Sequence, residues 1–195
     1  NESENGETLK ICLDEIENSR PFFIGIIGDR YGWVPDDTPA KMLNSDEERF
    51  KWENKLKAGE HSVTALEIYY GVLNSLEQKS RSFFYFRDDK FIKKVPAEKL
   101  HDVQDSNPID KSKLIKLKNT LKKLYTDSPD HIHEYSPKYK GLKINWLEIK
   151  NKTNQKNIDI KKLHKIADDG IVDNEELKEL NDKEKELVFN NTFPY

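Results

Sequence analysis

The residue best suited to chemistry in this sequence is a carboxylate near the start of an apolar helix. It is Glu67, in the stretch Ser62-Val63-Thr64-Ala65-Leu66-Glu67. A carboxylate held beside a bound nucleoside can stabilise the positive charge of the ribose while its glycosidic bond breaks. The same spacing also fits a capping box, because Glu67 follows Thr64 by three residues. Ser62 is an equally suitable cap, and in that case Glu67 is left for another role.

Two polar segments, each directly after an apolar run, supply candidate nucleotide-binding residues. The first is Gly28-Asp29-Arg30-Tyr31-Gly32-Trp33, and the second is Arg87-Asp88-Asp89. Glycines allow close backbone approach, and arginine is suited to binding phosphate. The alternative for the first segment is a tight turn with an Arg–Asp pair and a packed tryptophan. The candidate nucleotide-binding residues are Gly28, Asp29, Arg30, Trp33, Ser62 and Arg87.

Other site chemistries are less well supported by the residue spacing. The glycines match neither a GxGxxG nor a P-loop motif, which argues against a standard dehydrogenase or NTPase. His131 and His133 would share one face of a strand, but no third ligand follows, so no metal site is predicted. The lysines of residues 111–125 surround a leucine stripe, so we expect them to form its solvated face. A nucleic-acid-binding role for them would require strongly salt-dependent binding.

The elements that must position these residues follow from the hydrophobic pattern. Residues 8–18 and 62–75 have the spacing of buried helices, and the first must end before Pro21. Residues 22–27 and 82–86 are apolar runs of strand length, and the first is predicted to be covered on both faces. This order is typical of an α/β domain with parallel strands. Ligands of such domains bind beyond the carboxyl ends of the strands.

The rest of the chain predicts a smaller, helical part. A helix over 111–125 and a strand over 131–135 complete the α/β body, and a polar stretch without apolar residues covers 150–157. We therefore expect the α/β domain to span 1–150 and a helical tail or insertion to span 151–195. The tail is expected to contain two short helices, near 158–167 and 174–188.

Composition restricts the class of protein. The 195 residues carry a net charge of −3, which argues against a globally basic nucleic-acid binder. The single cysteine, Cys12, excludes an internal disulfide. No apolar run approaches the roughly 20 residues of a membrane-spanning helix, and no signal peptide is evident. We expect a cytoplasmic protein without a membrane partner.

Several segments, taken in order, resemble one family. They are Gly6-Glu7-Thr8-Leu9, Cys12-Leu13-x-Glu15-Ile16, Arg20-Pro21-Phe22-Phe23-Ile24-Gly25, Gly28-Asp29-Arg30-Tyr31-Gly32-Trp33-Val34-Pro35, Ser62-Val63-Thr64-x-Leu66-Glu67-Ile68, Gly71-Val72-Leu73 and Phe83-Phe84-Tyr85-Phe86-Arg87-Asp88. Together they resemble the domain of unknown function at the N-terminus of nephrocystin-like and telomerase-associated NACHT or related STAND NTPases. The resemblance covers about Gly6 to Leu142.

The resemblance implies a fold. That family is similar to TIR domains, so it implies a three-layer α/β fold with a flavodoxin-like parallel sheet. Members normally open with a strand and helix that carry a Ser-Ser-Thr-Phe-like motif, and neither is present here. The sheet is therefore expected to be incomplete at its start. The polar first residues, beginning at Asn1, likewise suggest a piece of a longer protein.

The resemblance also implies two functions. The first is a signalling or effector module of a STAND-type NTPase that acts through self-association and contacts with sister domains. The second follows the analogy with TIR enzymes, which places Glu67 near the catalytic glutamate that cleaves nicotinamide from NAD. In that case Arg30, Trp33 and Ser62 would shape the pocket, NAD would be the substrate, and no cofactor would be required. A Glu67 carboxylate in a cleft with Arg30 and Trp33 favours the enzyme, and a capping Glu67 favours the module.

Overall fold

A computed structural model describes residues 2–43, 48–49, 51, 56–153 and 160–195. The chain divides into two compact units, each considered by itself below. The first contains Asn1–Phe86 and Asn107–Glu134, and the second contains Arg87–Ser106 and Tyr135–Tyr195. All residues of the candidate site except Arg87 lie in the first unit.

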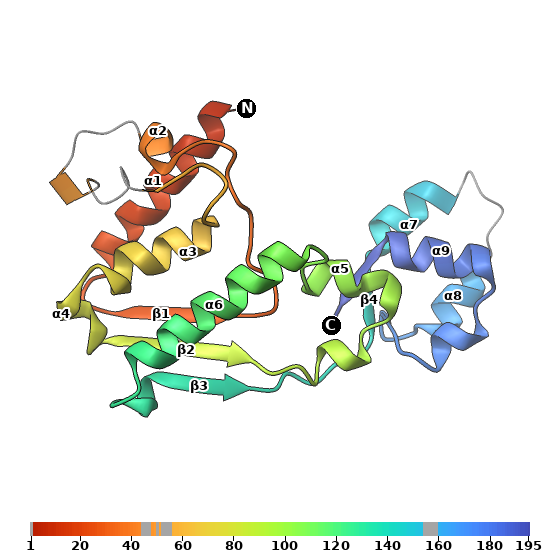
Figure 1. Cartoon of the computed structure of the whole chain (residues 1–195). Helices are drawn as coiled ribbons and strands as arrows, with labels where there is room; N and C mark the ends of the chain where they lie inside the picture. The colour runs from red at the N-terminus through yellow and green to blue at the C-terminus, as the bar shows by residue number, and fades with distance from the viewer. Residues whose placement is uncertain (1, 44–47, 50, 52–55, 154–159) are drawn as a thin grey trace. The chain divides into compact units, whose positions relative to one another are not determined.

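The first unit is built on a three-stranded sheet in the order β1-β2-β3. Its strands are β1 (Phe23–Ile27), β2 (Ser82–Arg87) and β3 (Ile132–Tyr135). Strands β1 and β2 are parallel, from the pair Phe23 and Ser82 to the pair Ile27 and Phe86. The arrows of β2 and β3 point the same way (Figure 1). The prediction of an α/β fold with a parallel sheet is confirmed.

Helices of the first unit account for most of its remaining residues. They are α1 (Glu2–Asn18), α2 (Pro39–Leu43), α3 (Val63–Ile68), the π-helical turn η2 (Tyr69–Leu73), α4 (Leu76–Lys79), α6 (Pro108–Leu124) and the 3-10 turn η5 (Pro129–His131). The start of α3 is fixed by Ser62, whose hydroxyl accepts a hydrogen bond from the backbone N–H of Ala65 at 3.2 Å. Ser62 is therefore the N-cap, and the alternative in which Thr64 begins a capping box with Glu67 does not occur.

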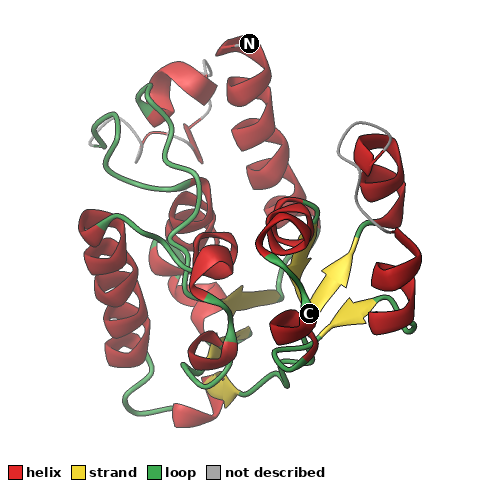
Figure 2. Ribbon diagram, turned by 90° about the vertical axis from the view of Figure 1, so that its right-hand side faces the viewer, coloured by secondary structure: helices red, strands yellow, loops and turns green. Residues whose placement is uncertain are grey.

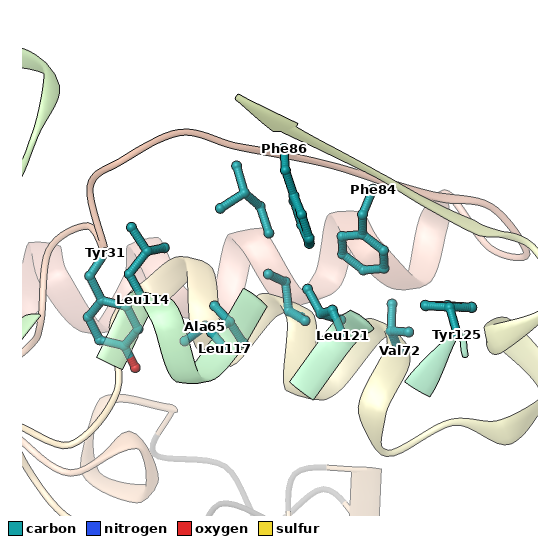
Figure 3. Close-up of a cluster of buried hydrophobic side chains, with 11 residues drawn as sticks. Tyr31, Ala65, Val72, Phe84, Phe86, Leu114, Leu117, Leu121 and Tyr125 are labelled. Carbon is teal, nitrogen blue, oxygen red and sulfur yellow. The ribbon is translucent and has the colours of Figure 1, made fainter. Parts of the chain in front are cut away.

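One face of the sheet packs against α3, η2 and α6 to form the main core (Figure 3). Phe84 and Phe86 from β2 meet Ala65 and Val72 on one side and the leucine stripe of α6 on the other. That stripe consists of Leu114, Leu117 and Leu121. A second cluster joins α1 to the opposite side of α3 and η2, through Leu9, Leu13, Leu66 and Tyr70. Helix α3 is thus buried on two sides, as its apolar sequence predicts.

The opposite face of the sheet exposes apolar side chains. Phe22, Ile24 and Ile26 are 62%, 66% and 69% exposed, and Tyr85 is 37% exposed. The prediction that residues 22–27 are covered on both faces is wrong for the described residues, because α3 and α6 both pack on the face that carries Phe84 and Phe86 and leave Ile24 and Ile26 exposed. The structure remains compatible with a three-layer fold, of which the described residues provide the sheet and the helices of one side.

The second unit has its own small sheet and core. Its sheet has the antiparallel order β5-β4-β6, with β4 (Leu142–Ile144), β5 (Ile171–Val172) and β6 (Thr192–Pro194) (Figure 2). Its helices are η3 (Ile92–Lys94), η4 (Ala97–Lys99), α5 (Leu100–Val103), α7 (Trp146–Thr153), α8 (Ile160–Ile166), η6 (Glu176–Glu179) and α9 (Asp182–Asn190). Across the described residues of both units, no helix combines the length and the apolar character needed to cross a membrane.

Candidate functional site

Glu67 lines a cavity between helix α1 and strand β1. The cavity has a volume of about 660 Å³. Its other lining residues are Ile11, Cys12, Glu15, Ile16, Ser19, Phe22, Phe23 and Ile24. Most of these side chains are apolar, so Glu67 is the half-buried carboxyl group of a largely hydrophobic site.

The electrostatics of the cavity are dominated by a carboxyl–thiol pair. Burial raises the pKa of Glu67, and a hydrogen bond from Cys12 partly offsets this effect. The pKa of the Cys12 thiol is raised to about 11 by burial, by its hydrogen bond to Glu67 and by the negative charge of Glu67. At neutral pH the thiol is therefore protonated and can donate to Glu67. Since the thiolate is the nucleophilic form of cysteine, Cys12 is a hydrogen-bond donor here.

The candidate nucleotide-binding residues that follow β1 do not line this cavity. Trp33 is 48% exposed, and its carbonyl oxygen accepts a hydrogen bond from the Val63 N–H at 3.0 Å. The Asp29 carboxylate lies 3.6 Å from the Lys118 ammonium. Arg30 is exposed, and Gly28 directly follows β1. The structure thus joins Trp33 to the start of α3, and it brings neither Trp33 nor Arg30 into the cavity that Glu67 lines.

Arg87, the last residue of β2, lies in the second unit. Its guanidinium donates to the carbonyl oxygen of Val103 at 2.9 Å and lies 4.9 Å from the centre of the Phe91 ring. These contacts hold the start of that unit together. Within the described ranges, no group of three or more His, Cys, Asp or Glu side chains is arranged to hold a metal ion.

The exposed sheet face is a second feature of functional interest. We define the bare sheet face as Phe22, Ile24, Ile26, Phe83 and Tyr85. Two imidazole rings stack on it, His133 of β3 on Tyr85 and His131, the last residue of η5, on Phe83, each at 4.9 Å between ring centres. None of the five residues is charged. Sequence reasoning identified these strands but not their exposure, since exposure depends on which helices cover them.

A smaller cavity of about 170 Å³ was also missed by sequence reasoning. It lies between the loop after β1, the segment before α3, η2 and α6. Its polar lining residues are Tyr31, Glu60, His61, Tyr69, Lys113, Lys116 and Thr120. The available signal was the lysine-rich face of α6, which the sequence analysis assigned to solvent alone.

The fold and these surfaces define a small α/β domain with a parallel sheet. Its family is identified by a family model described as a domain of unknown function (DUF4062), which matches residues 1–140. The chain belongs to this family. No solved structure matches it.

Known relatives are much longer proteins. A TPR repeat-containing protein of Dictyostelium discoideum is 32% identical over 143 residues, which are 69% of this chain and 8% of that protein. Telomerase protein component 1 of Mus musculus is 34% identical over 97 residues, and that of Rattus norvegicus is 35% identical over 97 residues. Each of these two matches covers 49% of this chain and 4% of the relative. The chain therefore corresponds to a small part of each relative.

Proposed function

We propose that this chain is a protein-contact module of a larger protein, a cytoplasmic signalling or effector part of a STAND-type NTPase that acts through self-association. The observation that carries the proposal is the bare sheet face. Large apolar side chains gathered on one exposed surface are typical of protein contacts. The resemblance to domains attached to STAND NTPases and the small share of each relative that the chain matches support the same interpretation.

A second copy of the chain is the occupant that fits this face best. Ile24 and Ile26 lie on β1, which is an edge strand of the sheet among the described residues. The bare sheet faces of two copies can pack against each other across a two-fold axis, which covers the exposed apolar side chains of both. Such an axis places equal residues close together. The five side chains of the bare sheet face are uncharged, so their own burial in this contact desolvates no charge.

The test is the oligomeric state of matched lysine variants, measured by size-exclusion chromatography with light scattering over a range of concentrations. The unmodified chain is expected to form a dimer, and Ile26→Lys is expected to be monomeric because the contact would bury an unpaired charge. Ile115→Lys is the control, since Ile115 is 59% exposed on α6, away from this face. A chain that stays monomeric at all concentrations, or equal behaviour of both variants, would contradict the proposal.

A second candidate function is an NAD or nucleotide glycohydrolase with Glu67 as the catalytic carboxylate. The position of Glu67 in the larger cavity favours it. In this reaction the bond between the nicotinamide nitrogen and ribose C1′ breaks, ionised Glu67 stabilises the ribosyl cation, and water adds to C1′ with loss of a proton. Arg30, Trp33 and Ser62 lie outside the cavity lining, so substrate contacts would come chiefly from α1 and β1.

Release of nicotinamide from NAD tests this candidate. Glu67→Gln is expected to abolish release, whereas Glu77→Gln, which changes an exposed carboxylate of α4 outside the cavity lining, is expected to retain it. Because burial raises the pKa of Glu67 and the ionised form is the active one, the rate should rise with pH through that pKa. Absence of release, even when the chain is forced to oligomerise, would leave the protein-contact module as the function.

A further inference from the structure

The smaller cavity has the lining expected of an anion site. Two lysines of α6, Lys113 and Lys116, reach it beside His61. Lys116 makes no ion pair with any residue of the described ranges, and Lys113 donates to the carbonyl oxygen of Gly59 at 2.8 Å. The only carboxylate among the lining residues is Glu60. The lining side chains carry two ammonium groups and one carboxylate, and protonation of His61 would add a further positive charge. Asp110, whose carboxylate lies 4.0 Å from the Lys113 ammonium, offsets the charge of Lys113 and leaves Lys116 as the principal cation of the cavity.

His61 is held in place by aromatic groups from two other segments. Its Nδ1 lies 3.4 Å from the Tyr31 hydroxyl, and its ring makes an edge contact with Tyr69 at 5.0 Å between centres. Tyr31 itself closes one end of the main core, at the opposite end from Tyr125 (Figure 3). The Lys113 ammonium lies 5.7 Å from the centre of the Tyr31 ring. These contacts fix the imidazole at the cavity wall before any ligand arrives.

The volume of the cavity limits the ligand to a small group. A cavity of about 170 Å³ holds several waters at roughly 30 Å³ each. It is smaller than the roughly 300–1,000 Å³ of sites that enclose a drug-sized molecule. One tetrahedral oxyanion fits this space, and a larger molecule could place only its terminal phosphate there.

We infer that this cavity is a binding site for a phosphate group, with Lys116, Lys113 and His61 as its donors. Glu60, whose carboxylate lies 4.0 Å from the His61 Nε2, accepts the hydrogen of a monoprotonated phosphate. Sulfate carries no such hydrogen at neutral pH, so Glu60 would repel it. The site therefore prefers phosphate to sulfate.

Binding at this site is coupled to a proton. Burial lowers the pKa of His61, the negative charge of Glu60 raises it, and the positive charges of Lys113 and Lys116 lower it. Tyr31 and Tyr69 are the other titratable groups that face the ring. A bound dianion adds negative charge beside the imidazole and so favours its protonated form. Phosphate binding is therefore expected to take up a proton and to strengthen as pH falls.

The test is titration calorimetry of the whole chain with inorganic phosphate, with AMP and with sulfate, in buffers of different ionisation enthalpy. Saturable phosphate binding with proton uptake and weaker sulfate binding is expected. Lys116→Gln should weaken phosphate binding about tenfold, the usual effect of losing a hydrogen bond from a charged donor. Lys123→Gln makes the same charge change on an exposed part of α6 and should leave the affinity unchanged. His61→Gln should abolish the proton uptake.

Comparison of AMP with inorganic phosphate distinguishes a phosphomonoester from the free phosphate ion as the ligand. Tighter binding of AMP, with the same loss in Lys116→Gln, would identify a phosphomonoester as the ligand. Equal or tighter binding of inorganic phosphate would identify the free ion. If neither ligand binds, or if Lys116→Gln and Lys123→Gln weaken binding equally, the inference is overturned. Thermal unfolding of each variant checks that it is folded.

Discussion

Cys12 and Glu67 shift each other's pKa because both line one largely hydrophobic cavity. The thiol donates and the carboxylate accepts, and burial disfavours the ionised form of both. Burial is the largest cause of the rise in the Cys12 pKa to about 11, and the hydrogen bond to Glu67 and the negative charge of Glu67 add to it. Cys12 is therefore held as the thiol, the unreactive form, over the neutral range.

The rate of Cys12 alkylation tests the raised pKa of this thiol. A thiol pKa of about 11 in place of 9.0 lowers the thiolate fraction about a hundredfold at pH 8, because each pKa unit is a factor of ten. Iodoacetamide should therefore react with the folded chain far more slowly than with the unfolded chain. Glu67→Gln should recover part of this rate, since it removes the negative charge but not the burial. Equal rates in the two folded proteins would show that Glu67 does not act on the thiol.

Helix α3 positions Glu67 and contributes to the main core. It carries Glu67 toward α1 and buries Ala65 and Ile68 against the sheet, and Ser62 fixes where it begins. The Ser62 cap also leaves Glu67 available for the cavity. A helix that started at Thr64 would instead have used Glu67 to satisfy its own backbone.

Replacement of this cap should be costly. Ser62→Ala removes the acceptor for the buried Ala65 N–H, so we expect a loss of about 1–2 kcal/mol in the free energy of unfolding. Urea unfolding measures the loss. Ser112→Ala, at an exposed position of α6, is the control and should change the stability by less than about 0.5 kcal/mol. If both variants unfold at the same urea concentration, Ser62 does not hold the start of α3.

Local pattern was sufficient for the larger elements of the first unit. Continuous apolar runs predicted β1 and β2 to within a residue, and the leucine stripe predicted α6. Pattern could not predict β4, β5 and β6, which have only two or three residues each. These strands exist because Lys143 pairs with both Ile171 and Phe193, which are distant in sequence. The polar stretch predicted as a domain boundary near residue 150 begins within α7.

The candidate site was predictable only in part, because it too depends on contacts between residues that are distant in sequence. The helical position of Glu67 followed from the sequence around it. Its neighbour Cys12 did not, because the contact depends on how α1 packs against α3. Likewise, His61 lies more than fifty residues from Lys116 in sequence, so only the folded chain shows that they share a cavity.

At the scale of the whole molecule, the distribution of charge decides how association should respond to salt. The chain carries 33 basic and 36 acidic residues, yet the bare sheet face has none of them. A contact made by this face is apolar, and such contacts are not weakened by screening; sulfate strengthens them. Association through the lysines of α6, for example with nucleic acid, would instead weaken steeply as salt rises.

The dimer is therefore predicted to persist when NaCl is raised from 0.1 to 1 M, and to tighten in sodium sulfate. Sedimentation equilibrium at each salt concentration gives the dissociation constant. The net charge of −3 adds only a small repulsion between copies, which salt would screen and so favour the dimer slightly further. A dissociation constant that rises tenfold or more over this range would mean that charged groups form the contact. In that case the bare sheet face would not be the surface through which the chain associates.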